Sequence, residues 1–267
     1  MIRRRLRELR KNGLVSIQHQ ICTDKTGRPE NIVLLTPRGY NLAKKNDRIG
    51  KINILENKAI DSYCINHDLL VNWVIIALLQ MKRQLLNVQL YFLTPYYSSI
   101  EKGSPNSSLI KIQLFGNNDT PDFIPDCVFV LSDSESHKAL LFFIEVDMGT
   151  ETRISRKRET KDVRQKIINY QELFKSSQYK LFEKHFNFSL NGFRLLFITN
   201  TNSRLKSICQ LVSVMPPSDF IWLTDQDAIF SSGISDQIWF KGGKREKGLE
   251  SILGERMASE CKILIPK

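Results

Sequence analysis

Apolar and polar positions along the chain form long blocks, and each block predicts a helix or a strand. His67 to Arg83 repeats apolar side chains with a helical period, and the wide apolar face is typical of a helix buried against a sheet. Two later apolar runs, Cys127 to Leu131 and Ala139 to Val146, are bounded by polar turns and predict buried strands. A basic helix is predicted to follow over Arg153 to Lys175.

Shorter segments with the same patterns extend this arrangement. Strands are predicted at Gln89 to Thr94, Leu109 to Leu114, Phe193 to Thr199 and Phe220 to Leu223, and a helix at Ser203 to Val214. Strands and helices that alternate after a buried helix indicate an α/β domain, in which helices flank a mixed sheet. The most apolar stretch, Leu69 to Leu79, is shorter than the ~20 residues of a membrane span, so we expect no membrane contact.

The first 50 residues carry a separate pattern that ends in a polar linker, and we predict domains at 1–50 and 51–267. The predicted elements are an arginine-rich helix from Ile2 to Asn12, strands at Leu14 to Ile21 and Asn31 to Leu35, and a helix from Pro37 to Lys45 with Thr36 as its N-cap. Their order resembles the second half of a winged helix-turn-helix, whose recognition helix enters the major groove. A winged helix normally begins with two further helices, so we expect upstream residues, another subunit or another domain to complete its core.

Charge indicates a polyanionic partner. The chain carries 39 Lys and Arg against 28 Asp and Glu, a net charge of +11, and twelve of the basic residues lie in the first 50 against four acidic ones. Such a segment suggests nucleic acid or an anionic membrane as the partner, although a solvated basic face has the same composition. The residues expected to contact DNA are Arg3, Arg4, Arg5, Arg7, Arg10, Lys11, Arg28, Arg38, Arg156, Lys157 and Lys161.

The cysteines indicate neither a zinc site nor a disulfide framework. Cys22, Cys64, Cys127, Cys209 and Cys261 are far apart, odd in number and without zinc-binding spacing. Reduced, mostly buried thiols are typical of the cytosol, and the charged N-terminus lacks the apolar core of a signal peptide. We therefore expect a cytoplasmic protein.

Acidic residues stand at the ends of the two predicted central strands. Asp126 follows Pro125 at the start of one strand, and Glu145 and Asp147 end the next. An ionised carboxylate in an apolar setting is costly unless it is paired or bound to a metal. The position of these acids is explained if they bind Mg²⁺ or Mn²⁺ in an enzyme that hydrolyses phosphodiester bonds. A Pro-Asp turn that merely opens a strand is the structural alternative for Asp126.

The order of these features, from apolar helix through a Pro-Asp strand and a Glu-Val-Asp strand to a basic helix, resembles the PD-(D/E)xK nuclease superfamily. The resemblance implies a restriction-endonuclease-like fold over residues 51–267, with Asp126 and Glu145 as metal ligands and Glu101 as a third acid. It also implies that Lys166 to Tyr170 corresponds to the QxxxY motif of the RecB-like branch, with lysine in the glutamine place.

One position departs from the superfamily pattern, because residues 145–147 read Glu-Val-Asp where Glu-x-Lys is expected. The absent lysine normally positions the attacking water and neutralises charge on the phosphate. In some members of the superfamily this lysine lies on the following helix, where Lys157, Lys161 and Lys166 are candidates. We favour Lys166, which is one turn from the tyrosine of the motif. Alternatively the last residue of the motif, Asp147, is a further metal ligand.

A closer resemblance covers nearly the whole chain and is most specific at Phe143 to Glu151. With the basic N-terminal segment, the His-Asp-Leu segment of the apolar helix and the Lys-x-x-x-Tyr helix, the chain is similar to the replication-relaxation family of plasmids and mobile elements. This resemblance implies a role at mobile-element DNA. The resemblance also implies that His67 belongs to the site. Judged by its residue type and position alone, His67 would be a capping or core histidine.

Two functions are compatible with these patterns. The first is a Mg²⁺- or Mn²⁺-dependent DNA endonuclease that nicks or cuts, with Asp126, Glu145 and Asp147 at the metal and Lys166 at the scissile phosphate. The second is a non-catalytic DNA-binding regulator or relaxosome accessory factor, which the missing Glu-x-Lys lysine favours. DNA is the expected partner in both cases. A homodimer and the replication or mobilisation proteins of the element are further candidates.

Overall fold

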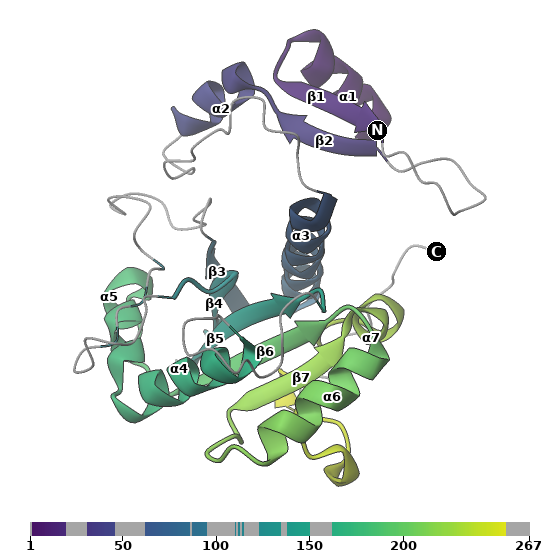
Figure 1. Cartoon of the computed structure of the whole chain (residues 1–267). Coiled ribbons are helices and arrows are strands. Elements are labelled where there is room, and N and C mark those ends of the chain that lie inside the picture. Colours follow the sequence, from purple (N-terminus) through teal and green to yellow (C-terminus); the bar gives the residue numbers. More distant parts are fainter. Residues whose placement is uncertain are drawn as a thin grey trace. The chain divides into compact units, whose positions relative to one another are not determined.

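The structure is a computed structural model that describes residues 2–19, 31–45, 62–85, 87–94, 123–134, 138–149 and 162–254, together with residues 110, 112 and 114. The described elements fall into two compact units (Figure 1). The N-terminal unit contains the elements before residue 46, and the second unit contains those after residue 61.

The N-terminal unit has the four elements that its sequence predicts. They are α1 (Ile2–Lys11), β1 (Val15–His19), β2 (Asn31–Leu35) and α2 (Pro37–Lys44), with β1 and β2 paired antiparallel. Gly13 follows α1 in a left-handed conformation, φ +67°, which favours glycine. The Thr36 hydroxyl caps α2, because it accepts from Gly39 N at 3.0 Å, and it donates to Gly13 O at 2.6 Å. One threonine thus ties the start of α2 to the end of α1.

In the part of the chain that the structure describes, the second unit is a six-stranded sheet with helices packed on it (Figure 1). The helices are α3 (Ser62–Gln84), α4 (Val163–Lys175), α5 (Glu183–Phe186), α6 (Asn202–Ser213) and α7 (Gln226–Ser232), with 3-10 turns η1 (Gln178–Phe182) and η2 (Arg245–Lys247). The strands are β3 (Val88–Leu93), β4 (Cys127–Asp133), β5 (Lys138–Asp147), β6 (Phe193–Thr199), β7 (Ile221–Asp225) and β8 (Phe240–Lys241). The predicted α/β class, a mixed sheet flanked by helices, is confirmed.

The strands lie in the order β3-β4-β5-β6-β7-β8. The first three form an antiparallel meander, β5, β6 and β7 run parallel, and β8 returns antiparallel to β7. The parallel register places Asp147 beside Thr199 and Thr199 beside Asp225, so the carboxyl ends of three strands share one edge of the sheet. Ligand sites of parallel sheets commonly lie at this edge.

Both faces of the central strands are covered, which explains why β4 and β5 are apolar at nearly every position. On one face α3 packs through the fully buried side chains of Val74, Leu78 and Met81, while α4 and α6 cover the other face (Figure 1). Phe129 of β4 and Phe142 of β5 stack with ring centroids 4.5 Å apart. This core holds the edge of β5 in place.

The largest differences from the predicted elements concern the basic helix and the strand at residues 109–114. The basic helix begins at Val163 rather than at Arg153, because Asp162 has an extended backbone and its side chain accepts from Gln165 N at 2.7 Å, as an N-cap does. Residues 153–161 lie outside the described residues. Of the strand predicted at 109–114, Ile112 is described in an isolated bridge with Phe123. None of the described helices is both long and apolar enough to cross a membrane.

Candidate functional site

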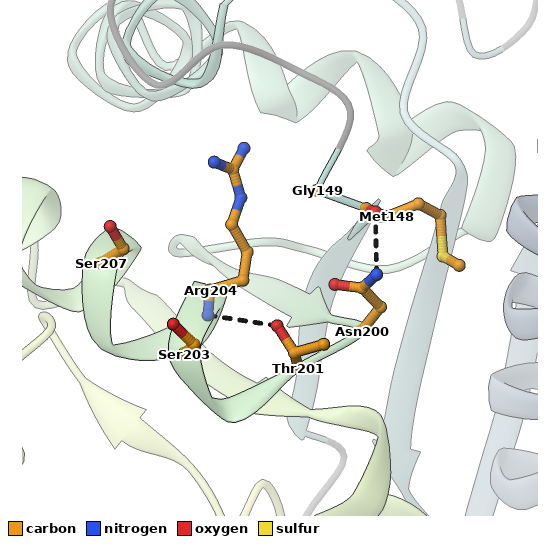
Figure 2. Close-up of a pocket in the computed structure, with 7 residues that line it drawn as sticks. All are labelled: Met148, Gly149, Asn200, Thr201, Ser203, Arg204 and Ser207. Atoms are coloured by element: carbon orange, nitrogen blue, oxygen red, sulfur yellow. Dashed lines mark hydrogen bonds between the residues drawn. The ribbon is translucent and has the colours of Figure 1, made fainter.

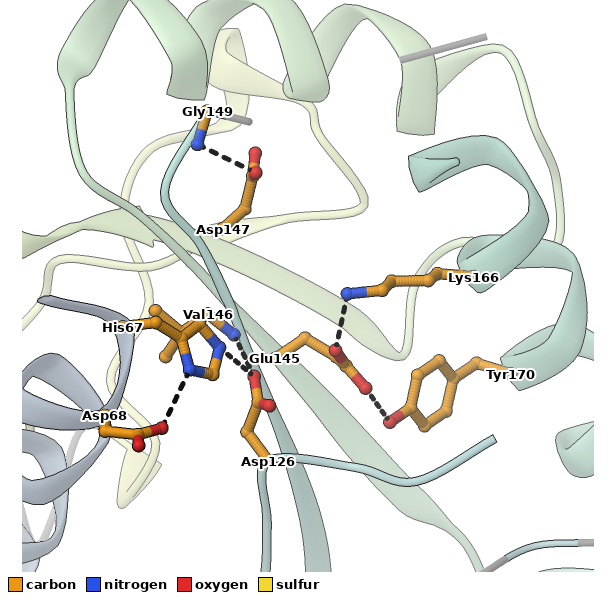
Figure 3. Close-up of polar contacts among 9 residues, drawn as sticks. All are labelled: His67, Asp68, Asp126, Glu145, Val146, Asp147, Gly149, Lys166 and Tyr170. Atoms are coloured by element: carbon orange, nitrogen blue, oxygen red, sulfur yellow. Dashed lines mark hydrogen bonds and ion pairs between the residues drawn. The ribbon is translucent and has the colours of Figure 1, made fainter. Parts of the chain in front are cut away.

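Asp126 lies immediately before β4 and is held by the main chain of β5. Its own N–H donates to Ile144 O at 3.2 Å, and its Oδ2 accepts from Val146 N at 2.8 Å (Figure 3). The antiparallel register, with Cys127 opposite Ile144, brings Asp126 alongside Glu145. The two acids predicted for the site are therefore neighbours on adjacent strands.

A histidine from α3 contacts the Asp126 carboxylate. His67 Nε2 lies 3.2 Å from Asp126 Oδ2, and His67 Nδ1 lies 3.4 Å from Asp68 Oδ1 (Figure 3). The hydrogen bond to Asp126, together with that to Asp68, raises the pKa of His67 from 6.5 to about 10. The imidazole is therefore protonated at neutral pH and forms an ion pair with Asp126.

The Glu145 side chain is only 4% exposed, and both of its oxygens have partners on α4. Tyr170 OH donates to Oε1 at 2.7 Å, and Lys166 Nζ lies 3.1 Å from Oε2 (Figure 3). Burial raises the pKa of Glu145 from 4.5 to about 7, although the Lys166 ammonium acts in the opposite direction. A carboxyl group that changes charge near neutral pH is typical of functional sites.

Tyr170 is fixed by aromatic packing around its ring. The ring contacts those of Phe123, Phe143 and Phe193, with centroid distances of 5.0, 5.5 and 6.3 Å. Burial and the Glu145 carboxylate raise the pKa of Tyr170 well above its ordinary value, so the phenol keeps its proton. Tyr170 therefore remains a hydrogen-bond donor that orients Glu145.

Asp147 lies two residues beyond Glu145, on the same face of β5, and has its own partners. Its side chain is fully buried; Oδ2 accepts from Arg204 Nε at 2.5 Å and Oδ1 from Gly149 N at 2.9 Å. Arg204 lies in the first turn of α6, which Thr201 caps. Pairing of this kind is what a buried carboxylate requires. The part of Asp147 as a metal ligand stays a prediction.

Asp126 and Glu145 are the pair of acids here that suits a divalent metal ion. Carboxylate oxygens are preferred ligands of Mg²⁺ and Mn²⁺, and Mg²⁺ is commonly held by one or two carboxylates with waters. Within the described ranges, no group of three or more His, Cys, Asp or Glu is arranged to hold a metal. The raised pKa of Glu145 means that the protein alone compensates its charge incompletely. Two neighbouring carboxylates are the kind of donor set that holds a hydrated divalent cation, and metal binding by Asp126 and Glu145 stays a prediction.

Four of the residues predicted for the catalytic site meet in the structure. Asp126, Glu145, Lys166 and Tyr170 gather at the end of β5, and their catalytic roles stay predictions. The predicted residues that lie outside the described ones are Arg28, Glu101, Arg156, Lys157 and Lys161. The predicted DNA-contacting residues of the N-terminal unit that are described are all exposed, namely Arg3, Arg4, Arg5, Arg7, Arg10, Lys11 and Arg38.

Arg204 contacts Asp147 but was not among the predicted site residues. The available signal was the polar turn Thr199 to Thr201 between a strand and a helix, because a threonine N-cap places Arg204 in the first helical turn. Nothing in the sequence pattern indicated that β6 pairs in parallel with β5, which is what brings this turn beside Asp147.

Comparison with protein families matches residues 1–187 to the family described as replication-relaxation. The matched segment includes the N-terminal unit and the second unit through α5, so it contains Asp126, Glu145, Lys166 and Tyr170 and ends before Arg204. No curated protein and no solved structure matches the chain.

Proposed function

The chain belongs to the replication-relaxation family, and we propose that it is a DNA endonuclease of a plasmid or mobile element that depends on Mg²⁺ or Mn²⁺. Membership of the family supports plasmid or mobile-element DNA as the partner. The observation that carries the hydrolytic part is the pair Asp126 and Glu145, with Lys166 Nζ 3.1 Å from Glu145 Oε2. Phosphodiester hydrolysis needs acids that hold a metal and a cation that offsets phosphate charge.

The order of elements supports a restriction-endonuclease-like fold for the second unit. The helix α3, the strands β3, β4 and β5, and the helix α4 follow one another as in the resemblance to the PD-(D/E)xK superfamily. Asp126 precedes β4, and Glu145 lies near the end of β5. Lys166 and Tyr170 are one turn apart on α4, so both reach the same carboxylate.

In the proposed mechanism Asp126 and Glu145 hold the metal ion, which when bound supplies an activated water and stabilises the departing oxygen. His67 holds Asp126 from α3, and Tyr170 holds Glu145 from α4. Both acids are thus oriented by groups outside their own strands. Because the pKa of Glu145 is about 7, loss of its proton prepares the site for a cation.

In this proposal Lys166 replaces the lysine of the Glu-x-Lys motif, which is absent from residues 145–147. Its ammonium group reaches Glu145 from α4 rather than from β5, and 24% of its side chain is exposed. An ammonium group in this place can donate to a non-bridging phosphate oxygen and offset the charge that develops during hydrolysis. This arrangement works because α4 covers the face of the sheet toward which Glu145 points.

The N-terminal unit supplies the proposed DNA-binding surface. Six exposed basic residues lie on α1, and the hairpin and α2 follow it, an order that supports a partial winged helix-turn-helix with α1 in the major groove. Arg3, Arg7 and Arg10 share one side of α1 because they are spaced by four and three residues.

A second function, a non-catalytic DNA-binding regulator or relaxosome accessory factor, is favoured by one observation. Asp147 stands where the superfamily has lysine, and its carboxylate is engaged with Arg204. In this alternative Lys166 is only the counterion of Glu145. The protein would then bind DNA through its N-terminal unit without cutting it.

Incubation of supercoiled plasmid with the chain in Mg²⁺, Mn²⁺ or EDTA tests the proposal. We expect nicked or linear DNA with either metal, none in EDTA, and none from Asp126→Asn. Asp227→Asn, which changes an exposed acid on α7, is the matched control and should cut as the wild type does. A folded wild type that binds the plasmid and leaves it intact with both metals supports the regulator instead.

A further inference from the structure

Three lysines spaced three residues apart gather around one aspartate of the second unit. Lys241 ends β8, Lys244 precedes η2 and Lys247 ends η2. Lys244 N donates to Lys241 O at 3.1 Å, and Lys247 N donates to Lys244 O at 3.4 Å. Each of these bonds closes a turn that brings Cα atoms three residues apart to within about 7 Å. The three side chains, two of them exposed and that of Lys244 half-buried, form the lysine cluster.

Asp219, just before β7, lies within the lysine cluster. Lys244 Nζ lies 2.9 Å from Asp219 Oδ1, and a Cβ at Gly242 would lie 3.1 Å from the same oxygen. The hydrogen bond from Lys244 lowers the pKa of Asp219, and the charges of Lys241 and Lys247 act in the same direction. All three ammonium groups therefore interact with one carboxylate. Three cations around one anion give this group of side chains a net positive charge.

The backbone that carries the cluster is fixed to the sheet and to α6. Gly242 and Gly243 have left-handed backbones, φ +63° and +72°, and a Cβ at Gly243 would overlap Cys209 O of α6. Only glycine allows this close approach. Gly242 N also donates to Ile221 O of β7 at 2.7 Å. The lysines therefore project from a rigid base.

The helix α6 joins the edge of β5 to the lysine cluster. Its first turn is capped by Thr201, whose hydroxyl accepts from Arg204 N at 3.2 Å (Figure 2), and Arg204 contacts Asp147. Its last turn contacts Gly243, where a Cβ would lie 3.1 Å from Ser213 N. Arg204 and Ser213 are nine residues apart, which is about 14 Å along the helix axis. A duplex covers this distance with about four base pairs.

The chemistry of the cluster indicates the class of its partner. Ammonium groups bind phosphate oxygens as point charges, without the fixed geometry of a base contact. Arg245 adds a further cation to the segment, and its guanidinium carbon lies 5.3 Å from the centre of the Phe240 ring. The exposed Glu246 lies one third of a turn from Lys247 in η2, so the two side chains leave the helix in different directions. Such a set of cations matches the regularly spaced phosphates of a nucleic acid backbone.

We propose that the lysine cluster binds the phosphate backbone of the DNA, beside the segment that reaches the candidate site. The inference rests on the proposed function, because it takes DNA as the partner, and it adds a contact surface on the second unit. The cluster lies beyond residues 1–187, so the family match does not assign it. Contacts of this kind hold a duplex in place whatever its base sequence.

Removal of two lysines that leaves the Lys244–Asp219 pair in place tests the proposal. Duplex affinity is measured in EDTA for the wild type and for the double variant Lys241→Gln/Lys247→Gln. Lys180→Gln/Lys184→Gln removes the same charge from other exposed positions of the second unit and is the matched control. We expect the cluster variant to bind about tenfold more weakly and to lower the salt slope by about 2, while the control stays near the wild type. Equal changes in both variants would overturn the proposal, because net charge alone would then explain them.

A change of the opposite sign tests the same surface. Asp219→Asn removes the negative charge within the cluster and should bind the duplex about threefold more tightly. Asp227→Asn removes an exposed acid of α7 and should stay near the wild type. Unchanged or weaker binding by Asp219→Asn would contradict a phosphate beside this carboxylate.

Vesicles of phosphatidylserine and phosphatidylcholine offer the lysines a different anionic surface. We expect Lys241→Gln/Lys247→Gln to change duplex affinity and to leave vesicle binding as it is in the wild type. Weaker vesicle binding with unchanged duplex affinity would overturn the proposal and assign the cluster to a membrane surface.

The outcomes separate this proposal from the proposed function. Cleavage by the wild type, combined with no specific effect of the cluster variant on affinity, overturns the surface and leaves the nuclease standing. A specific loss of affinity without any cleavage supports the surface and overturns the nuclease. Absence of DNA binding by the wild type overturns both.

Discussion

Lys166 Nζ on α4 lies 3.1 Å from Glu145 Oε2 on β5, and Tyr170 OH donates to the other oxygen of the same carboxylate at 2.7 Å. Two residues one turn apart on α4 therefore contact the two oxygens of the Glu145 carboxylate. The buried carboxylate at position 145 thus has a partner from α4 on each of its two oxygens.

Glu145 should make the protein less stable as pH rises through its titration. Its carboxyl group has a pKa of about 7 in the folded protein and near 4.5 in the unfolded chain, so the folded state binds the proton more tightly. The resulting stabilisation is full below pH 4.5 and is lost as pH rises through 7.

Urea unfolding of metal-free protein between pH 4.5 and 7.5 measures this effect. The free energy of unfolding should fall with pH more steeply in the wild type than in Glu145→Gln. Glu172→Gln, an exposed acid on α4 paired with Lys175, is the control and should keep the slope of the wild type. Parallel curves for wild type and Glu145→Gln would show that Glu145 is not shifted.

His67 should add a second pH dependence at higher pH. Its pKa is raised from 6.5 to about 10, chiefly by the hydrogen bond to Asp126, so the folded state favours the protonated imidazole. This contribution is full below pH 6.5 and disappears as pH rises through 10. Unfolding of His67→Gln should therefore depend less on pH between 6.5 and 10 than unfolding of the wild type. His185→Gln is the control, because burial lowers the pKa of His185 instead of raising it.

Two ion pairs in the second unit should differ in their contribution to stability. Arg204→Ala leaves the fully buried Asp147 carboxylate without its cation, which should cost about 3–5 kcal/mol of unfolding free energy. Lys244→Ala breaks a pair with the exposed Asp219 and should cost under about 1 kcal/mol. Denaturant titration of the two variants measures both values. Equal losses would mean that Asp147 is compensated by other groups.

The basic face of α1 should carry DNA affinity. Replacing Arg3, Arg7 and Arg10 by glutamine should weaken binding and lower the salt slope by about 1 for each phosphate that the variant no longer neutralises. Lys180→Gln and Lys184→Gln, exposed on the second unit, form the control pair. Titrations over a range of salt concentrations separate the two sets. The same slope in both would place the DNA-binding surface of the protein elsewhere.

Much of the fold follows from local sequence signals. The apolar runs at β4 and β5 predict buried strands because both faces are covered, and Thr36 marks the start of α2 because its hydroxyl replaces a missing helical partner. The start of α4 was predicted wrongly at Arg153. The basic sequence after Arg153 is compatible with a helix, so it does not indicate where the helix begins. The helix begins after Asp162, nine residues later, whose carboxylate is the N-cap.

The proximity of Asp126 and Glu145 was predictable, because both acids lie at the ends of apolar runs that form adjacent strands. Their functional roles stay predictions. The contact between His67 and Asp126 joins residues 59 apart, and it depends on how α3 packs on the sheet through Val74 and Leu78. The contact between Asp147 and Arg204 joins residues 57 apart and depends on the parallel register of β5 and β6. Neither packing nor crossover register leaves a local sequence pattern.

Cleavage of supercoiled plasmid in Mg²⁺ by the wild type, Glu145→Gln and Lys166→Gln, measured side by side, tests the central claim most directly. The account predicts cutting by the wild type, none detectable from Glu145→Gln, and a rate about 100-fold lower for Lys166→Gln, because its ammonium group stabilises charge only as the phosphate reacts. Lys175→Gln, at the exposed end of α4, should cut normally. Unchanged cleavage by folded Glu145→Gln or Lys166→Gln would contradict the assignment of this site.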